Sequence, residues 1–330
     1  MTTITQPGQP DRPDHPEQPG QPRGGFRHEF YPYLGDEEFL DGALGFIHDA
    51  QDARETVIVS VPSDRQALLR AELPDSTSVA FIDGATPGRN PGTLLAVWQD
   101  EIARHAAEGR PLRGIGESAW RQARTPSEAA ELRYHEWLLN LAFADSAAWW
   151  LLCPYDTADD DPVSLQAMAR CHPLVRRDGS AVASEDYDRD APYSFEDLTD
   201  PCGPQDELAY ARGGLTAVRD KITTCATRAE LPESRLGELL LAATEVAANS
   251  IRHGGGRGTL RTWTQDSAFI CEFHDTGHIQ NPLAGRIRPT HHQHGGRGLW
   301  LVHQLCDLVE IRSTAQNGTT IRLHMRLTTG

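Results

Sequence analysis

The sequence predicts two folded domains: an α/β domain built on a parallel sheet, followed by an α+β sandwich of helices and strands. Three observations predict this. A length of 330 residues suits about two domains. Strand-like and helix-like segments alternate through residues 26–175, which is typical of a parallel sheet with crossover helices. In residues 208–330, two helix-like segments instead precede a series of strand-like ones.

Two further segments lack the pattern of a folded domain. Residues 1–25 carry a proline at every third position from 7 to 22, so we expect an extended, disordered tail that serves as a spacer rather than as a PxxP ligand. Residues 176–207 are acidic, rich in Ser and Pro and poor in aliphatic side chains, so we expect a linker between the domains.

The composition limits the kinds of partner. The net charge is −16 and the pI is near 5.3, so the chain repels phosphate backbones and we expect no direct binding of nucleic acid. The six cysteines are scattered without a CxxC pair, which favours reduced thiols. No apolar run approaches the ~18 residues of a membrane span, and the N-terminus lacks an apolar signal core. We therefore expect a soluble cytoplasmic protein with no membrane contact.

The first domain has the layout of a P-loop fold without its phosphate cradle. Its strand candidates are 56–61, 78–84, 111–117 and 147–156, and its helix candidates are 63–73, 91–109 and 127–145. In a nucleotide-binding α/β domain, the loop after the first strand carries glycines and a lysine for phosphate. Here that loop reads VPSDRQ and has neither, and the GIG at 114–116 is too short to indicate a dinucleotide site.

The second domain begins with two helix candidates, 208–229 and 232–253. Four strand candidates follow, at 258–265, 268–275, 308–314 and 318–327. Helices beside a meander of strands indicate the α+β sandwich.

Three stretches of the second domain carry the chemistry. In TEVAANSIRHGGG (244–256), Glu245, Asn249 and His253 are four residues apart and share one helix face. HDTGH (274–278) places an Asp at a strand end before a glycine, and HGGRGLWLV (294–302) opens an apolar helix with glycines. An Asn oxygen suits Mg²⁺, an Asp can accept a hydrogen bond from the adenine amino group, and glycines at a helix start suit phosphate. One site with these three roles predicts ATP.

These motifs, in this order, resemble the GHKL superfamily, which has the Bergerat ATP fold of histidine kinases, gyrase and Hsp90. The helix is similar to the N box of that family, DTG to its G1 box and GGRGLWLV to its G2 box, and Gly318-Thr319 is similar to its last glycine motif. The G1 pattern is usually DxGxG, and the second glycine position is occupied here by Ile279.

The resemblance implies a role for each matching residue. Glu245 would act as general base on the serine hydroxyl of a partner, and Asn249 would hold Mg²⁺ between the phosphates of ATP. Asp275 would recognise adenine, with Gly277 letting the base approach. Gly296, Arg297 and Gly298 would bind the phosphates, and Gly295 would be the hinge of the lid. His253 and Thr319 would also contact ATP.

Two features narrow the resemblance to one subgroup. The segment IQNPLAGRIRPTHHQH (279–294) implies a short ATP lid, and no dimerising phospho-acceptor helix pair precedes the domain. In both features the domain resembles the RsbW-type anti-sigma serine kinases of bacterial partner switching. In the first domain, five stretches look like the MEDS sensory domain, whose fold is similar to RecA-type ATPases: HEFYPYLGDEEFL, GRNPG, LRGIGESAW, HEWLLNLAF and WWLLCPYD. The chain thus resembles the RsbA-like anti-sigma factors of actinobacteria, in which a MEDS domain is fused to an ATPase domain of this kind.

This resemblance implies an anti-sigma factor that sequesters a sigma factor and uses Mg²⁺ and ATP to phosphorylate a Ser or Thr of an anti-anti-sigma (STAS) partner. The first domain would sense a signal, such as a small molecule, and a homodimer fits because related kinases are often dimers. Two alternatives stay open. One is a non-catalytic partner-switching module with a degenerate or structural ATP site, which Ile279 favours. The other is a sensor histidine kinase.

The histidines near the motifs have two interpretations each. His253 fits either a phosphate or lid contact, or a helix-end histidine that interacts with the helix dipole. His291, His292 and His294 look like a metal cluster, but they fall in the expected lid without a helical His-x₃-His frame, so we expect no metal there.

In the first domain, one histidine and two adjacent tryptophans are expected in the core. His135, in RYHEWLL, has an apolar frame around it, which favours burial over autophosphorylation. Trp149 and Trp150 lie in a strand-like run and favour core packing. A sensory pocket could use these tryptophans, or Cys153 and Cys171.

Overall fold

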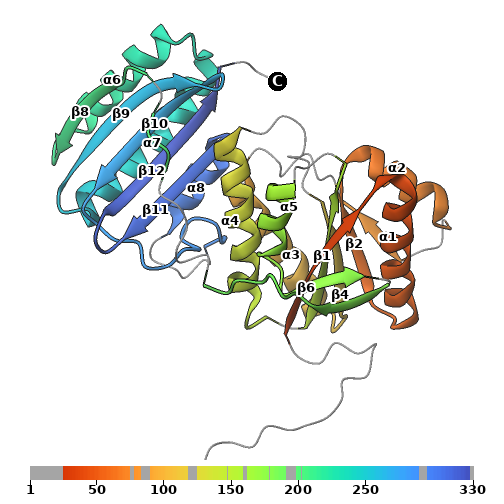
Figure 1. The fold of residues 1–330 in the computed structure, drawn as a ribbon. Helices are drawn as coiled ribbons and strands as arrows, with labels where there is room; N and C mark the ends of the chain where they lie inside the picture. Colours follow the sequence, from red (N-terminus) through yellow and green to blue (C-terminus); the bar gives the residue numbers. More distant parts are fainter. Residues whose placement is uncertain are drawn as a thin grey trace, which may run out of the picture.

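The chain forms two sheets, one in each half of the sequence, and Figure 1 shows them at opposite ends of the molecule with helix α4 (Pro126–Phe143) between them. The computed structural model describes residues 25–74, 78–82, 90–117, 125–146, 148–158, 162–177, 179–190, 198–201, 203–289 and 296–327. The predicted proline-rich tail therefore lies almost entirely outside the described residues.

The first sheet has seven strands in the order β3-β2-β4-β5-β1-β6-β7. Neighbouring strands are parallel except for β6 and β7, which are antiparallel. The strands are β1 (Phe26–Tyr33), β2 (Thr56–Ser60), β3 (Val79–Phe81), β4 (Leu112–Gly116), β5 (Trp149–Asp156), β6 (Leu174–Arg177) and β7 (Ser180–Ala183). Every residue of β5 is buried, as expected for a central parallel strand that is covered on both faces.

Helices cover both faces of this sheet, so the predicted α/β layout is confirmed. Side chains of α1 and α2 share one core with the strands, and those of α3, α4 and α5 share the other. Trp149 and Trp150 point to opposite faces and each joins one of these cores. The helices, with one 3₁₀ turn, are α1 (Gly35–Asp52), α2 (Ser63–Glu72), η1 (Pro91–Thr93), α3 (Leu94–Ala107), α4 and α5 (Pro162–Ala169).

The second sheet has five antiparallel strands in the order β11-β12-β10-β9-β8. Helices pack on one of its faces, which confirms the predicted α+β sandwich. On β10, Phe269, Cys271 and Phe273 point into that core, while Glu272 pairs with arginines on the other face. The elements are β8 (Asp206–Ala211), α6 (Leu215–Arg228), α7 (Glu233–His253), β9 (Arg257–Gln265), β10 (Ala268–Asp275), α8 (Arg297–Leu305), β11 (Leu308–Thr314) and β12 (Gly318–Arg326).

The structure corrects the start of the second domain. The helix predicted at 208–229 begins only at Leu215, and Asp206–Ala211 form β8 instead. Leu208 and Tyr210 alternate with exposed residues, so this segment can bury one side of an edge strand against β9. Segment 176–207, expected to be a linker, also contributes the end of β6, all of β7 and the start of β8.

The first sheet contains a strand that the sequence did not predict. Strand β1, which pairs with β5 and β6, was not among the strand candidates because Arg27, His28 and Glu29 interrupt its apolar pattern. The GIG fragment at 114–116 lies within β4, inside the strand predicted at 111–117. A Cβ on Gly114 would come within 2.8 Å of the Trp98 ring, so this glycine makes room for packing.

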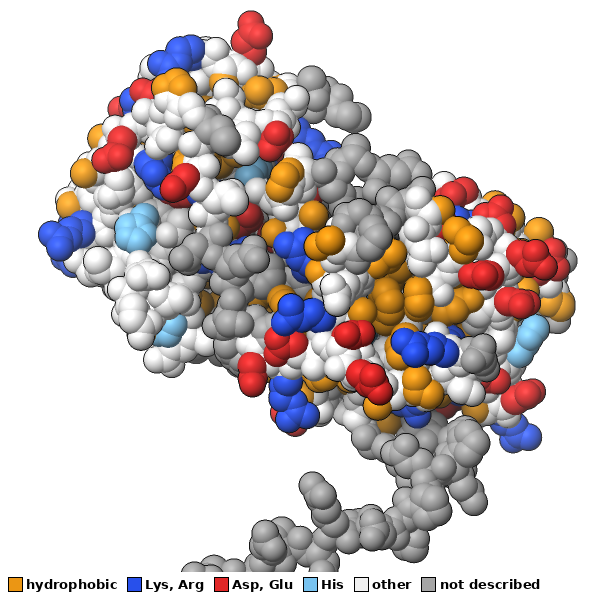
Figure 2. Space-filling model, in the orientation of Figure 1, with side chains coloured by type: hydrophobic (Ala, Val, Ile, Leu, Met, Phe, Trp, Pro, Cys, Tyr) orange, Lys and Arg blue, Asp and Glu red, His pale blue; other side chains and the backbone are white. Residues whose placement is uncertain are grey.

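The surface of the first domain is acidic around α1. Figure 2 shows acidic side chains gathered at this end of the molecule, and the first turn of α1 carries Asp36, Glu37 and Glu38. In the part of the chain that the structure describes, no helix combines the length and the apolar character that crossing a bilayer requires.

Candidate functional site

The polar face of α7 meets the beginning of α8. Glu245 and Asn249 are half-buried on this face, and the opposite side of the helix is buried in the core. A Cβ placed on Gly298 would lie 2.6 Å from Oε2 of Glu245 and 3.6 Å from Nδ2 of Asn249. Because Gly298 has no side chain, the first turn of α8 can approach the carboxylate and the amide. The partial positive charge at the start of α8 thus faces an acidic side chain.

The end of α7 lies against the strand end that carries Asp275. The helix finishes where the Gly254 N–H donates to the carbonyl of Ser250 at 2.8 Å. A Cβ on Gly254 would lie 2.3 Å from Cγ of Asp275, so only glycine fits there. A helix rises 1.5 Å per residue, so Asn249 lies only about 7.5 Å along the axis from Gly254. Asp275 therefore lies at the end of α7 that is nearer to Asn249.

Hydrogen bonds hold the turn after Asp275. The Gly277 N–H donates to Oδ1 of Asp275 at 2.7 Å, and the Thr319 hydroxyl donates to the Gly277 carbonyl at 2.9 Å. Ser313 Oγ lies 2.7 Å from the Thr319 hydroxyl and accepts the Ile279 N–H at 2.8 Å. Thr319 is buried. Its hydroxyl therefore fixes the Asp275 turn.

Gly318, like Thr319, packs against the turn that carries Asp275. Its φ is +76°, a conformation that favours glycine, and a Cβ there would lie 2.1 Å from the Asp275 carbonyl oxygen. On another side, Asp275 and Thr276 border a pocket of about 380 Å³, together with residues of β8 and β9.

The remaining predicted residues that the structure describes are exposed at the end of α7 and the start of α8. Gly296, with φ of +79°, is the N-cap of α8, and the exposed Arg297 follows it. His253 is also exposed, in the last turn of α7. The predicted hinge Gly295 and the histidines at 291, 292 and 294 lie outside the described residues.

The start of the expected lid is bound to the first domain. Arg286 donates to Oε2 of Glu131 at 2.5 Å, and Arg312 of β11 donates to Oε1 at 2.9 Å. Glu131 lies on α4 and is 0% exposed, and Arg286 is 1% exposed. A single buried carboxylate therefore joins the lid segment and the second sheet to α4.

A second contact joins the 3₁₀ turn η1 to α8. The Asn90 side-chain amide donates at 3.2 Å both to the His303 carbonyl and to Nδ1 of the His303 ring. A Cβ on Gly92 would lie 2.3 Å from that ring. Burial lowers the pKa of His303 well below its usual value, so the ring is neutral and accepts through Nδ1. The far end of α8 thus rests on the first domain.

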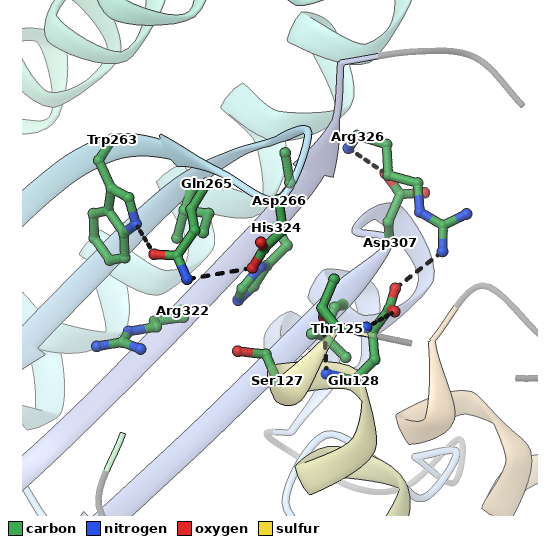
Figure 3. A pocket seen from close by; sticks show the side chains of 13 residues that line it. Thr125, Ser127, Glu128, Trp263, Gln265, Asp266, Asp307, Arg322, His324 and Arg326 are labelled. Atoms are coloured by element: carbon green, nitrogen blue, oxygen red, sulfur yellow. Dashed lines mark hydrogen bonds and ion pairs between the residues drawn. The ribbon is translucent and has the colours of Figure 1, made fainter. Parts of the chain in front are cut away.

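A third contact forms the wall of a pocket at the domain junction (Figure 3). Thr125 and Glu128 form a capping box that starts α4, with bonds of 3.2 and 2.9 Å. Glu128 also pairs with Arg326 of β12 at 3.0 Å, and the Arg326 N–H donates to Asp307 at 2.8 Å. Figure 3 shows Thr125 and Glu128, at the start of α4, on the opposite side of the pocket from the side chains of β9.

Sequence reasoning missed the residues that join the domains. Glu131 and Asn90 look like ordinary surface residues in the sequence, and only their burial and their partners reveal a role. An Asn-Pro-Gly turn before a helix was a signal at Asn90, although it did not identify the partner. His135, expected in the core, is buried, and burial lowers its pKa to about 4.

The second domain is an antiparallel sheet covered by helices on one face, with glycines at the end of α7 and at the start of α8. Residues 211–325 match the family described as histidine kinase-like ATPase domain. Residues 27–173 match the family described as MEDS, the methanogen/methylotroph DcmR sensory domain. The chain therefore carries a MEDS domain followed by a histidine kinase-like ATPase domain, as the sequence motifs predicted.

Among solved structures, the RsbU and RsbW domains of Rv1364c from Mycobacterium tuberculosis are similar to this chain at 17% identity with a TM-score of 0.30. That similarity covers 39% of this chain and 34% of the other. The comparison with curated proteins found no match.

Proposed function

We propose that the chain is an anti-sigma factor with protein serine/threonine kinase activity, which binds a sigma factor and phosphorylates a STAS-type anti-anti-sigma partner under control of its MEDS domain. The observation that carries the proposal is the approach of Gly298 to Glu245 and Asn249 on α7, the helix whose terminal Gly254 packs against Asp275. This approach supports a site in which Glu245 acts as the base, Asn249 as a metal ligand, Asp275 as the adenine acceptor and the start of α8 as the phosphate-binding element.

The residues present fit Mg²⁺ and ATP. Asn249 offers an amide oxygen to Mg²⁺, and Asp275, whose Oδ1 is held by the Gly277 N–H, keeps Oδ2 for the adenine amino group. The N–H groups from Gly296 to Gly298 suit phosphate. The metal, when bound, neutralises charge on the transferring phosphate. Glu245 would take the proton of a serine hydroxyl.

The buried Glu131 supports control by the MEDS domain. Arg286 belongs to the expected lid and bonds to α4 of the first domain. A movement of α4 would therefore displace the lid of the nucleotide site directly. Sensing in one domain and phosphoryl transfer in the other would be coupled through this pair.

The test measures nucleotide binding and transfer separately. Calorimetry of the full chain with ATP and Mg²⁺ should show one site per chain. Radiolabelled ATP should then label an added STAS partner in an acid-stable form. Label that is acid-labile and stays on the chain itself indicates a histidine kinase, and the proposal is then wrong.

A non-catalytic partner-switching module is the second candidate, and one observation favours it. Ile279 stands where the G1 pattern has glycine; its N–H donates to Ser313 and its side chain packs on the core. The beginning of the lid is therefore held to the core by a side chain that a glycine would lack. Sigma-factor binding without transfer of label to the STAS partner would support this candidate.

Gly254→Ala should weaken ATP binding by roughly tenfold or more, because its Cβ would displace the Asp275 carboxyl group. The matched control is Gly237→Ala in the same helix, where no atom lies within 4 Å of the added Cβ. That change should leave the affinity unchanged and stabilise the chain by about 0.5–1 kcal/mol. Calorimetry and thermal unfolding check both. Equal affinities for the two variants would contradict the assigned contact.

A further inference from the structure

A buried cluster of metal-ligating side chains lies in the first domain, apart from the proposed nucleotide site. His28 of β1, Glu136 of α4, Cys153 of β5 and His172, which follows α5, each offer one ligand atom. These four atoms all lie within 4.8 Å of one another, and all four residues are buried. Three elements and the loop after α5 thus bring ligand atoms close together.

Four of the six separations between these atoms are close to those in the shell of a tetrahedral metal ion, and the other two are within 4.8 Å. Nε2 of His28 lies 3.3 Å from Sγ of Cys153 and 3.3 Å from Oε2 of Glu136. The same carboxylate oxygen lies 3.5 Å from Nε2 of His172 and 3.9 Å from Sγ of Cys153. Zn²⁺ bonds of about 2.0–2.3 Å in a tetrahedron place the ligand atoms about 3.3–3.8 Å apart.

Hydrogen bonds outside the cluster fix both imidazole tautomers. Asn140 donates from Nδ2 to the Cys171 carbonyl at 2.7 Å, so its Oδ1, 3.1 Å from Nδ1 of His28, accepts the His28 proton. Nδ1 of His172 lies 2.8 Å from the Met168 carbonyl, which can only accept. Both rings therefore carry their proton on Nδ1 and turn the lone pair of Nε2 toward the cluster, as in bound metal ligands.

The cluster has fewer hydrogen-bond donors than acceptors. Three acceptor atoms face its centre, from His28, His172 and Glu136, and the Cys153 thiol supplies one weak donor. Nε2 of His172 has no hydrogen-bond partner among the described residues. Buried polar atoms normally have partners, because leaving them unpaired costs about 1–3 kcal/mol each. A central cation would bond to all four atoms.

We propose that His28, Glu136, Cys153 and His172 form a binding site for a divalent transition-metal ion, with Zn²⁺ as the preferred occupant. Sulfur and imidazole ligands select against Mg²⁺ and Ca²⁺, which take oxygen ligands. The Cys153 thiol releases its proton to solvent when the metal binds. The thiolate and the carboxylate then balance the two positive charges, so the buried site is neutral.

The surroundings resemble a closed site rather than a catalytic one. The rings of Phe30 and Tyr155 lie 5.5 and 5.7 Å from the His172 ring, and the Phe26 ring lies 5.3 Å from that of His28. Four protein ligands inside an aromatic shell leave no position for a reacting molecule. Helix α4, which supplies Glu136 here, also supplies Glu131 to the ATPase domain.

The test loads the full chain with Co²⁺, which reports on sulfur ligation. Wild-type protein expressed in medium containing Co²⁺, and measured without nucleotide, should hold one metal ion per chain by elemental analysis. It should also show a thiolate-to-cobalt charge-transfer band. Cys153→Ala should lose that band, and His172→Gln should weaken the affinity for Zn²⁺ roughly 100-fold or more in competition with a chelator.

The matched control is Cys171→Ala. Cys171 is equally buried and adjoins His172, but its thiol faces backbone carbonyls, so the band and the stoichiometry should both remain. Near-ultraviolet circular dichroism shows whether each variant is folded. A wild-type chain that binds no Co²⁺ or Zn²⁺ overturns the proposal, and so does a folded Cys153→Ala that keeps the band. The wild-type result does not depend on whether any variant folds.

Discussion

Glu245→Gln should lower the rate of phosphoryl transfer to the STAS partner by roughly 10²–10⁴-fold, which is the usual contribution of a general base. The amide keeps the shape of the side chain, so the close approach of Gly298 is preserved and the affinity for ATP should stay near that of the wild-type chain. The amide cannot accept the hydroxyl proton. Initial rates at saturating ATP, together with calorimetric affinities, measure the two effects separately.

The control for this variant is Glu233→Gln, at the exposed first turn of the same helix. It removes the same charge from α7 without touching the site, so both rate and affinity should match the wild-type values. A Glu245→Gln chain that transfers phosphate at the wild-type rate would exclude Glu245 as the base. A chain that no longer binds ATP would instead assign Glu245 to nucleotide binding.

Glu131→Gln should lower the free energy of unfolding by about 3–5 kcal/mol, because it leaves the buried Arg286 without its counter-charge. Arg312, which bonds to the other oxygen of the same carboxylate, also loses a charged acceptor. The lost stabilisation comes from the contact between α4 and the second domain. Urea unfolding of the full chain measures it, and hydrogen exchange at 283–289 shows whether the lid segment is released.

The chain contains a matched control for this effect. Arg288, two residues after Arg286, pairs with Asp100 of α3 at 2.9 Å, but the two side chains are 59% and 50% exposed. Solvent screens that pair, so Asp100→Asn should change the stability by about 0–1 kcal/mol. The two variants compare a buried and an exposed ion pair between the same two parts of the molecule. Equal effects would mean that the Glu131 pair is not buried in solution.

Much of the candidate nucleotide site could be predicted from the sequence because its residues are close together within single elements. The spacing of Glu245 and Asn249 fixed their shared helix face, and the glycines marked the ends of helices. The bounds of β10 were predicted without error because a short apolar run, AFIC, starts it and a turn follows Asp275. Each of these inferences rests on periodicity, which a chain shows without its tertiary structure.

Other parts were not predictable because their signals were weak or mixed. β8 begins in an acidic segment and was taken for linker and helix, since its two inward-facing residues, Leu208 and Tyr210, alternate over a short stretch only. β1 carries His28 and Glu29 in the middle of a sheet, where polar residues argue against a strand. The reason for those residues lies in their neighbours across the fold.

By itself, the sequence determined the class of each domain, the order of the glycine motifs and the helix face that carries Glu245 and Asn249. Only the tertiary structure decided that Gly298 meets Glu245, that Glu131 holds Arg286, and that His28, Glu136, Cys153 and His172 converge. The physical reason is that periodicity and chain breaks are local properties. Distances between side chains on different elements depend on how the two sheets and their helices pack, and no spacing along the chain records them.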